Sequence, residues 1–286
     1  MLTCPCESTA RPAASGFIRY AIGPSNLCYP RVMINVQVAD GIKTVTFSAP
    51  ERKNAVTRQM TLDLQRIVGE TAHDGTRVMI LTGEGDAFCA GADLKSAFEP
   101  GQDVSEYLRR VTNPTILAMR ALPIPIIARV HGVAVGIGCN YALACDIRIA
   151  STDARFGQIF AKIGLMPDGG STFFLPRMIG YARAFEWMAT ADIWDAARCH
   201  QAGLVNQVVP YAELDTAVSA LARRLAAGPA LAYAQIKRAL SIGDSGSLAD
   251  ALEAEATGQR TCIQSNDFRE GVAAFLEKRA PRFRGE

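Results

Sequence analysis

The sequence has little excess charge of either sign and no apolar stretch long enough to cross a bilayer. Its 30 Lys and Arg against 28 Asp and Glu give a formal net charge of +2. It therefore lacks the basic stripe that a nucleic-acid-binding protein needs. No apolar run reaches the roughly 18 residues of a membrane-spanning helix. We expect neither nucleic acid nor a membrane as a partner.

Disulfides and metal sites are also poorly supported. The chain has eight cysteines in 286 residues. They are dispersed and mostly lie in apolar segments, which predicts reduced, buried thiols and a cytoplasmic location. Cys4 and Cys6 have no second pair or histidine cluster to complete a zinc site. We expect no metal.

Residues 1–32 differ in composition from the rest of the chain. They mix Cys, Pro, Ser, Ala and Gly without a period, and they lack the basic start and apolar core of a signal peptide. This segment is interpreted as a mobile arm or as a start codon placed too early, with Met33 as the true start. An organellar import segment is a weaker alternative.

From Val32 onward the pattern becomes regular and predicts alternating strands and helices. A hairpin that turns at Asp40-Gly41 comes first, followed by a helix with Met60, Leu64, Ile67 and Val68 on one face. The later segments alternate in the same way: a buried strand at 77–85, a helix at 111–122, a strand at 123–132, a helix at 139–146 and a strand at 147–151. This order predicts an α/β fold with crossover connections.

After about Gly180 the pattern predicts helix following helix. Residues 211–228 end at a glycine, with Arg223 and Arg224 in the last turns. The last helix is expected to open on a capping box formed by Asp267 and Glu270. We predict one core over residues 33–225 and a helical region over 226–286.

Glycines punctuate two strand-to-helix turns, and three explanations are open. Gly136 and Gly138 lie in the apolar segment 133–146, and Gly91 lies between small residues in 86–94. The glycines could allow close packing of a helix on a strand. A dinucleotide fingerprint is disfavoured, because the spacing is not G-x-G-x-x-G and no acidic residue ends a strand about twenty residues on. Two such turns could also aim two backbone N–H groups at one point, as in an oxyanion hole.

Five ordered segments resemble the crotonase superfamily, also called the enoyl-CoA hydratase/isomerase family. They are ERKNAVT, AFCAGADL, HGVAVGIGCNYALACDIRIAS, RFGQIFAKIGLMPDGGS and LPRMIG. The resemblance covers about Met33 to Gly285. It implies a spiral of ββα units, a C-terminal helical region that builds a homotrimer or a dimer of trimers, and an acyl-CoA thioester substrate, with no cofactor beyond the CoA of the substrate.

The resemblance also implies which residues bind and polarise the thioester. The oxyanion donors would be the backbone N–H groups of Ala92 and Ile137. The residues implied to contact acyl-CoA are Arg52, Ala55, Ala90, Ala92, Asp93, Leu94, Phe160, Phe275 and Lys278. Phe275 and Lys278 are expected to close over the nucleotide from a neighbouring subunit. Residues 95–112 are expected to form part of the acyl-pocket wall.

The chain departs from the hydratases of the family at two positions. Where they carry two glutamates, it has Asn140 and Phe160. Addition of water needs one group that activates water and another that protonates carbon, and neither residue can transfer a proton. Asp168, in GLMPDGG, matches a catalytic aspartate of some relatives. The surrounding pattern, with Phe160 and the downstream LPR, most resembles the epoxyphenylacetyl-CoA isomerase branch of the family. Its alternative role is an N-cap on the helix that follows.

These residues favour an enoyl-CoA isomerase in which Asp168 is the acid–base group and Asn140 contacts substrate, water or only the backbone. A single carboxylate suffices to move a proton between two carbons. Three alternatives are a hydratase that lacks the two glutamates, a non-catalytic acyl-CoA binder and a dehalogenase. His131 is expected to be structural and His200 to lie at the surface. Cys139 has no basic neighbour in the sequence that would make it a nucleophile.

Overall fold

The computed structural model describes residues 33–94 and 103–286. The prediction for residues 1–32 and part of the proposed pocket wall, including Phe98, lie outside these ranges. The strands are β1 (Ile34–Ala39), β2 (Ile42–Phe47), β3 (Val78–Gly83), β4 (Ile126–Val130), β5 (Val133–Val135), β6 (Ile147–Ser151), β7 (Arg155–Gly157), β8 (Ile193–Asp195) and β9 (Gln207–Val209).

The α-helices surround these strands. They are α1 (Arg58–Thr71), α3 (Val104–Tyr107), α4 (Asn113–Ala121), α5 (Ile137–Ala144), α6 (Ser171–Ile179), α7 (Tyr181–Thr190), α8 (Ala196–Gln201), α9 (Tyr211–Ala226), α10 (Ala230–Ser245), α11 (Leu248–Ile263) and α12 (Asn266–Leu276). Shorter turns are the 3-10 helices η1 (Pro50–Arg52) and η3 (Ile159–Ile163) and the π-helix η2 (Leu108–Thr112). None of the helices in the described ranges is long and apolar enough to span a membrane.

A six-stranded sheet in the order β1-β2-β3-β4-β6-β9 forms the centre of the body. The first two strands form the predicted hairpin, in which Asp40 and Gly41 have φ values of 52° and 72°. All later neighbours in this sheet are parallel, as crossover connections require. The expected α/β class is confirmed.

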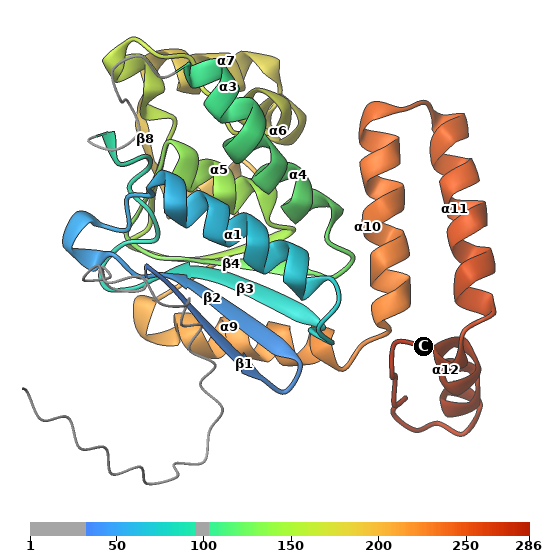
Figure 1. Cartoon of the computed structure of the whole chain (residues 1–286). Coiled ribbons are helices and arrows are strands. Elements are labelled where there is room, and N and C mark those ends of the chain that lie inside the picture. Colours follow the sequence, from blue (N-terminus) through green and yellow to red (C-terminus); the bar gives the residue numbers. More distant parts are fainter. Residues whose placement is uncertain (1–32, 95–102) are drawn as a thin grey trace, which may run out of the picture.

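Both faces of this sheet are buried, which explains why its central strands are apolar without interruption. Val78 and Ile80 of β3 lie in a cluster with Leu214 and Val218 of α9. Met79 and Leu81 belong to the larger core cluster on the opposite face. Figure 1 shows α9 beneath the sheet and α1 above it. The four predicted core residues of α1 are all buried.

A second, three-stranded sheet in the order β5-β7-β8 continues the spiral. Strand β5 begins three residues after β4 ends, so the two sheets meet at His131-Gly132. Strands β8 and β9 lie in a region for which only helices were predicted, because three residues are too few to show an alternating pattern.

The last three helices, α10–α12, extend away from the body as an arm (Figure 1). Lys237 of α10 ties the arm to the body: its Nζ donates to Asp146 Oδ2 over 2.8 Å and to the carbonyl oxygens of Met119 and Ile124. Arg77 donates to the carbonyl oxygens of Ala226 and Gly228, where the arm begins.

The predicted capping box of the last helix is wrong. Ser265 is the N-cap of α12 and accepts a hydrogen bond from the Phe268 N–H. The Asp267 carboxylate instead accepts from the backbone N–H groups of Arg284 and Gly285, so it holds the C-terminal tail. A capping box does occur one helix earlier, between Ser247 and Asp250 of α11.

Candidate active site

Two turns that contain glycines lie against each other. Gly91 is in the loop after β3, and Gly136 directly follows strand β5. Gly91 has φ +99° and Gly136 has φ +56°, a region that side chains with a Cβ rarely adopt. A Cβ on Gly91 would lie 3.2 Å from the Val135 carbonyl oxygen and 4.0 Å from Gly136 Cα. The conformation of each turn and their close approach both require glycine.

The residues that follow these glycines present free backbone donors. The N–H groups of Ala92 and Ile137 donate to no acceptor within residues 33–94 and 103–286. Their neighbours are fixed, since the Asp93 N–H donates to Val56 O and the Gly136 N–H to Gly157 O, both over 2.9 Å. Two unpaired donors on neighbouring rigid turns can stabilise one developing oxyanion.

Gly138 has a different role from Gly136. Its Cβ would lie 2.4 Å from the Cys89 carbonyl oxygen, so the absence of a side chain lets α5 approach the chain at Cys89. The close-packing explanation therefore holds at Gly138, and the oxyanion-hole explanation stays a prediction with which the conformation at Gly136 agrees. One glycine sets the conformation of the turn and the other allows close packing.

A buried asparagine holds the loop at residues 49–56 next to the first glycine turn. Asn54 Nδ2 donates to Glu84 O and Ala87 O, and its Oδ1 accepts from the Ala49 N–H. The Ala90 N–H donates to Lys53 O over 2.9 Å. These bonds bring together most of the proposed CoA-binding residues, namely Arg52, Ala55, Ala90, Ala92, Asp93 and Leu94.

Arg52 is half-buried in this loop. Its Nη1 lies 3.2 Å from Asp93 Oδ2, and its Nη2 contacts the sulfur of Met33. Its buried Nε has no protein partner among the described residues. A half-buried guanidinium with one unused N–H at this place is the kind of group that binds a phosphate.

Asp168 lies in the turn between η3 and α6, against the start of α5. A Cβ on the adjacent Gly169 would lie 2.4 Å from Ile137 Cδ1, so this turn contacts the residue whose N–H is free. The N-cap of α6 is Gly170 and no side chain caps that helix, which excludes the N-cap role for Asp168. Its Oδ1 is buried without a partner in the described chain, and burial raises the pKa of the carboxyl group from 3.8 to about 6.

Asn140 and Phe160 occupy the surroundings of the same turns. Asn140 is fully buried, and both polar atoms of its side chain have protein partners. Phe160 is half-buried, with its Cζ 3.9 Å from where a Cβ on Gly136 would be. An aromatic ring therefore lies beside the second donor turn.

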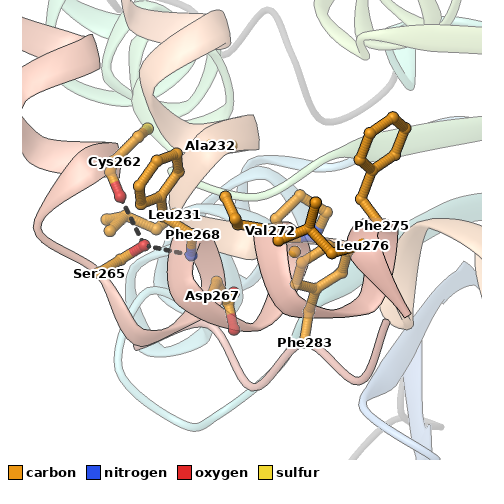
Figure 2. Close-up of a pocket in the computed structure, with 12 residues that line it drawn as sticks. Leu231, Ala232, Cys262, Ser265, Asp267, Phe268, Val272, Phe275, Leu276 and Phe283 are labelled. Atoms are coloured by element: carbon orange, nitrogen blue, oxygen red, sulfur yellow. Dashed lines mark hydrogen bonds between the residues drawn. The ribbon is translucent and has the colours of Figure 1, made fainter. Parts of the chain in front are cut away.

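Phe275 and Lys278 are not brought to this place. Both are on or next to α12, at the far end of the arm from the η1 loop (Figure 1). Phe275 is 83% exposed and lines an apolar cavity of about 380 Å³ between α10, the end of α11, α12 and the C-terminal tail (Figure 2). Within one chain they do not contact Arg52.

Three groups with no catalytic role in our predictions have structural environments. His131 Nε2–H donates to Gly85 O, its Nδ1 accepts from Arg129 Nη1, and the residue is 2% exposed. Burial raises the pKa of the Cys139 thiol to about 12, which makes it a poor nucleophile. His200 is exposed, as predicted.

Sequence reasoning missed Gln158 and Asn54. Both are buried, and both form hydrogen bonds that fix the segments around the glycine turns. Gln158 Nε2 donates to Asn140 Oδ1 over 2.8 Å. For Gln158 the available signal was a polar residue between Gly157 and Ile159 in FGQIF; Asn54, which follows Lys53, gave no such signal. Such a residue in a buried segment needs a hydrogen-bond partner.

The strand order, the two sheets and the paired glycine turns define a protein of the crotonase class. The family described as enoyl-CoA hydratase/isomerase matches residues 37–286. A Rhodobacter capsulatus protein named "Probable enoyl-CoA hydratase" is 40% identical over 256 residues, which cover 88% of this chain and 98% of that protein. The 1,2-epoxyphenylacetyl-CoA isomerase of Escherichia coli is 38% identical over 254 residues, 87% of this chain and 97% of that protein.

A solved structure agrees with these sequence matches. The enoyl-CoA hydratase of Bacillus anthracis superposes with a TM-score of 0.84 at 33% identity, covering 89% of this chain and 100% of that one. The chain belongs to the enoyl-CoA hydratase/isomerase family, and it is an acyl-CoA enzyme of that family.

Proposed function

We propose that the protein is an enoyl-CoA isomerase in which Asp168 moves a proton between two carbons of a bound thioester. The observation that carries this proposal is the buried Asp168 oxygen, which has no partner among the described residues, in a turn that packs against Ile137, the residue with the second free N–H. A carboxylate with a pKa near 6 is a base at neutral pH and can also return the proton.

The proposed reaction balances with this one acid–base group. The carboxylate takes a proton from C2 of a 3-enoyl-CoA, and the electron pair spreads to the thioester oxygen. The N–H groups of Ala92 and Ile137 donate to that oxygen; each such donor contributes on the order of 3 kcal/mol. The protonated Asp168 then delivers the proton to C4, which leaves a 2-enoyl-CoA. No cofactor beyond the CoA of the substrate takes part.

Hydration is the second candidate, because a relative at 40% identity carries a hydratase name. The residues around the turns argue against it. Asn140 is buried with both polar atoms paired, and Phe160 has no polar atom. Asp168 alone would have to activate water and protonate carbon on the same face.

The arm supports an oligomer as part of the proposed function. Leu240, Leu248, Phe275 and Leu276 are each at least 68% exposed on its helices. Large exposed apolar side chains on each of three helices of one arm indicate a protein interface. We propose that the arms associate in a homotrimer, in which Phe275 and Lys278 of one chain reach the CoA site of another.

The test is a paired assay of purified protein on 3-enoyl-CoA and 2-enoyl-CoA, followed by thioester absorbance and product mass. We expect a double-bond shift without a mass change, and its loss in Asp168→Asn with binding of the CoA ester retained. Asp192→Asn, at an exposed position, is the matched control. A gain of one water would favour the hydratase, and binding without turnover would favour a non-catalytic protein.

A further inference from the structure

The turn that carries Asp168 is held through its backbone, not through its side chain. The Asp168 carbonyl oxygen accepts from Asn140 Nδ2 over 2.8 Å, and from the N–H and hydroxyl of Ser171 over 3.2 and 3.0 Å. The Asp168 carboxylate has one oxygen with no protein partner in the described chain. The position of the carboxylate therefore depends on the groups that hold the carbonyl.

The direction of the hydrogen bonds around Asn140 is fixed by chemistry. A carbonyl oxygen can only accept, so Asn140 must present its NH₂ group to Asp168. Its Oδ1 then points the other way and accepts from Gln158 Nε2 over 2.8 Å. A half-turn of the Asn140 amide would bring two acceptors together at Asp168 and two donors together at Gln158, so both hydrogen bonds oppose it. Asn140 and Gln158 are both fully buried, so water does not substitute for either partner.

Gln158 belongs to the same rigid unit as the second oxyanion donor. It follows β7 directly, and Gly157 O in β7 accepts from the Gly136 N–H over 2.9 Å. Strand β5, which pairs with β7 in parallel, leads into the Gly136 turn. The small sheet thus fixes the Ile137 N–H on one side and Gln158 on the other.

We propose that Gln158 and Asn140 are positioning residues that hold the Asp168 turn in register with the Ile137 N–H. This inference rests on the proposed function of Asp168. Gln158 orients Asn140, Asn140 anchors the Asp168 carbonyl, and the carboxylate keeps its partly buried position in the turn that packs against Ile137. The asparagine at the position of a hydratase glutamate thus supports the remaining acid–base group.

The first variant is Gln158→Met, which keeps the length of the side chain and removes its donor. We expect kcat to fall by roughly 10- to 100-fold with KM changed by less than about threefold, because a misplaced acid–base group slows chemistry more than binding. The kcat/KM of the wild type should rise with pH through a midpoint near 6, since the ionised carboxylate is the base. In Gln158→Met that midpoint should move lower, because a looser turn admits water to the carboxylate.

The second variant, Asn140→Asp, keeps the shape and loses the donor to Asp168. It should lower kcat in the same way but move the midpoint higher, because a second carboxylate disfavours ionisation of the first. The matched control is Asn206→Asp: Asn206 uses only its oxygen, which accepts from the Arg148 N–H over 2.9 Å, and an aspartate retains that bond. It should leave kcat and the midpoint unchanged.

Two results separate this inference from the proposed function. If Asp168→Asn keeps its turnover, the proposed function fails and the positioning role fails with it. If Asp168→Asn is inactive while folded Gln158→Met and Asn140→Asp keep the wild-type kcat and midpoint, only the positioning role is overturned. Asn140→Asp supplies the test if Gln158→Met does not fold.

Discussion

At the scale of single residues, the proposed mechanism depends on the carboxyl group of Asp168, which lies where burial disfavours its ionised form. Among the described residues Asp168 has no cationic partner, and its side chain does not cap α6, whose N-cap is Gly170. Burial alone therefore sets its pKa. The same burial that would suit Asp168 to the proposed role of a base near neutral pH has a cost in folding free energy.

That cost gives a prediction for stability as a function of pH. The folded-state pKa, about 6, lies above the ordinary value of 3.8. The group therefore stabilises the fold fully below pH 3.8, and this contribution is lost as pH rises through 6. A shift of about two units corresponds to about 3 kcal/mol, and partial solvent contact reduces it to about 1–2 kcal/mol.

Asp168→Asn should therefore be more stable than the wild type at pH 8 by about 1–2 kcal/mol, and equal to it near pH 4. Denaturant unfolding at the two pH values measures both differences. Asp192→Asn, at an exposed position, should show neither. An Asp168→Asn variant that is less stable at pH 8 would contradict the unpaired burial of this carboxylate.

At the scale of elements, two glycines at the start of α5 have different effects. Gly136, the N-cap, determines the direction of the Ile137 N–H, and Gly138, in the first turn, determines how closely the helix packs. An alanine at position 136 must adopt φ +56° and ψ −131°, which rotates the turn and the Ile137 N–H. An alanine at position 138 meets the Cys89 carbonyl oxygen at 2.4 Å and separates α5 from the loop after β3. The first change disturbs a donor, and the second disturbs packing.

We expect Gly136→Ala to lower kcat by about 10²-fold or more, the effect of losing one oxyanion donor. Gly138→Ala should instead lower the free energy of unfolding by about 1–3 kcal/mol, as overpacking does. Steady-state kinetics and denaturant unfolding on both variants separate the two effects. Gly69→Ala is the control, because nothing lies within 4 Å of its Cβ position in α1. Equal behaviour of the variants at 136 and 138 would argue against the division of roles.

Elements with a long period were predictable from the sequence, and short or tertiary features were not. Helix α1 and strand β3 carry enough apolar residues for their faces to be assigned, and their burial agrees. Strands β8 and β9 have three residues each and show no alternation. The role of Asp267 was misread because its partners, Arg284 and Gly285, are far along the chain.

The candidate site divides in the same way. A positive φ restricts the residue type largely to glycine. Gly91 and Gly136 could therefore be recognised in the sequence as positions of special turns. The contact between Gln158 and Asn140 joins positions 18 residues apart through the small sheet. No local pattern encodes such a contact. The burial of Asp168 also depends on chain packing that a sequence motif does not describe.

At the scale of the whole molecule, the arm separates two parts of one proposed CoA site. Arg52 lies at the end of the body where the η1 loop meets the glycine turn, and Phe275 lies on α12, away from it (Figure 1). Lys237 and Arg77 hold the arm in this extended position. With the arm so held, the proposed closure of the nucleotide site by Phe275 and Lys278 would need a second chain.

This arrangement predicts that turnover depends on assembly. Light scattering should give three times the chain mass, and specific activity should fall on dilution as the oligomer dissociates. Leu240→Glu, at a position 68% exposed on α10, should shift the mass toward the monomer and raise KM for the CoA ester by about tenfold, since a buried charge opposes association. Val38→Glu, at an exposed position on β1, should change neither. Full activity in a monomer would show that the body alone binds CoA and would remove Phe275 and Lys278 from the site.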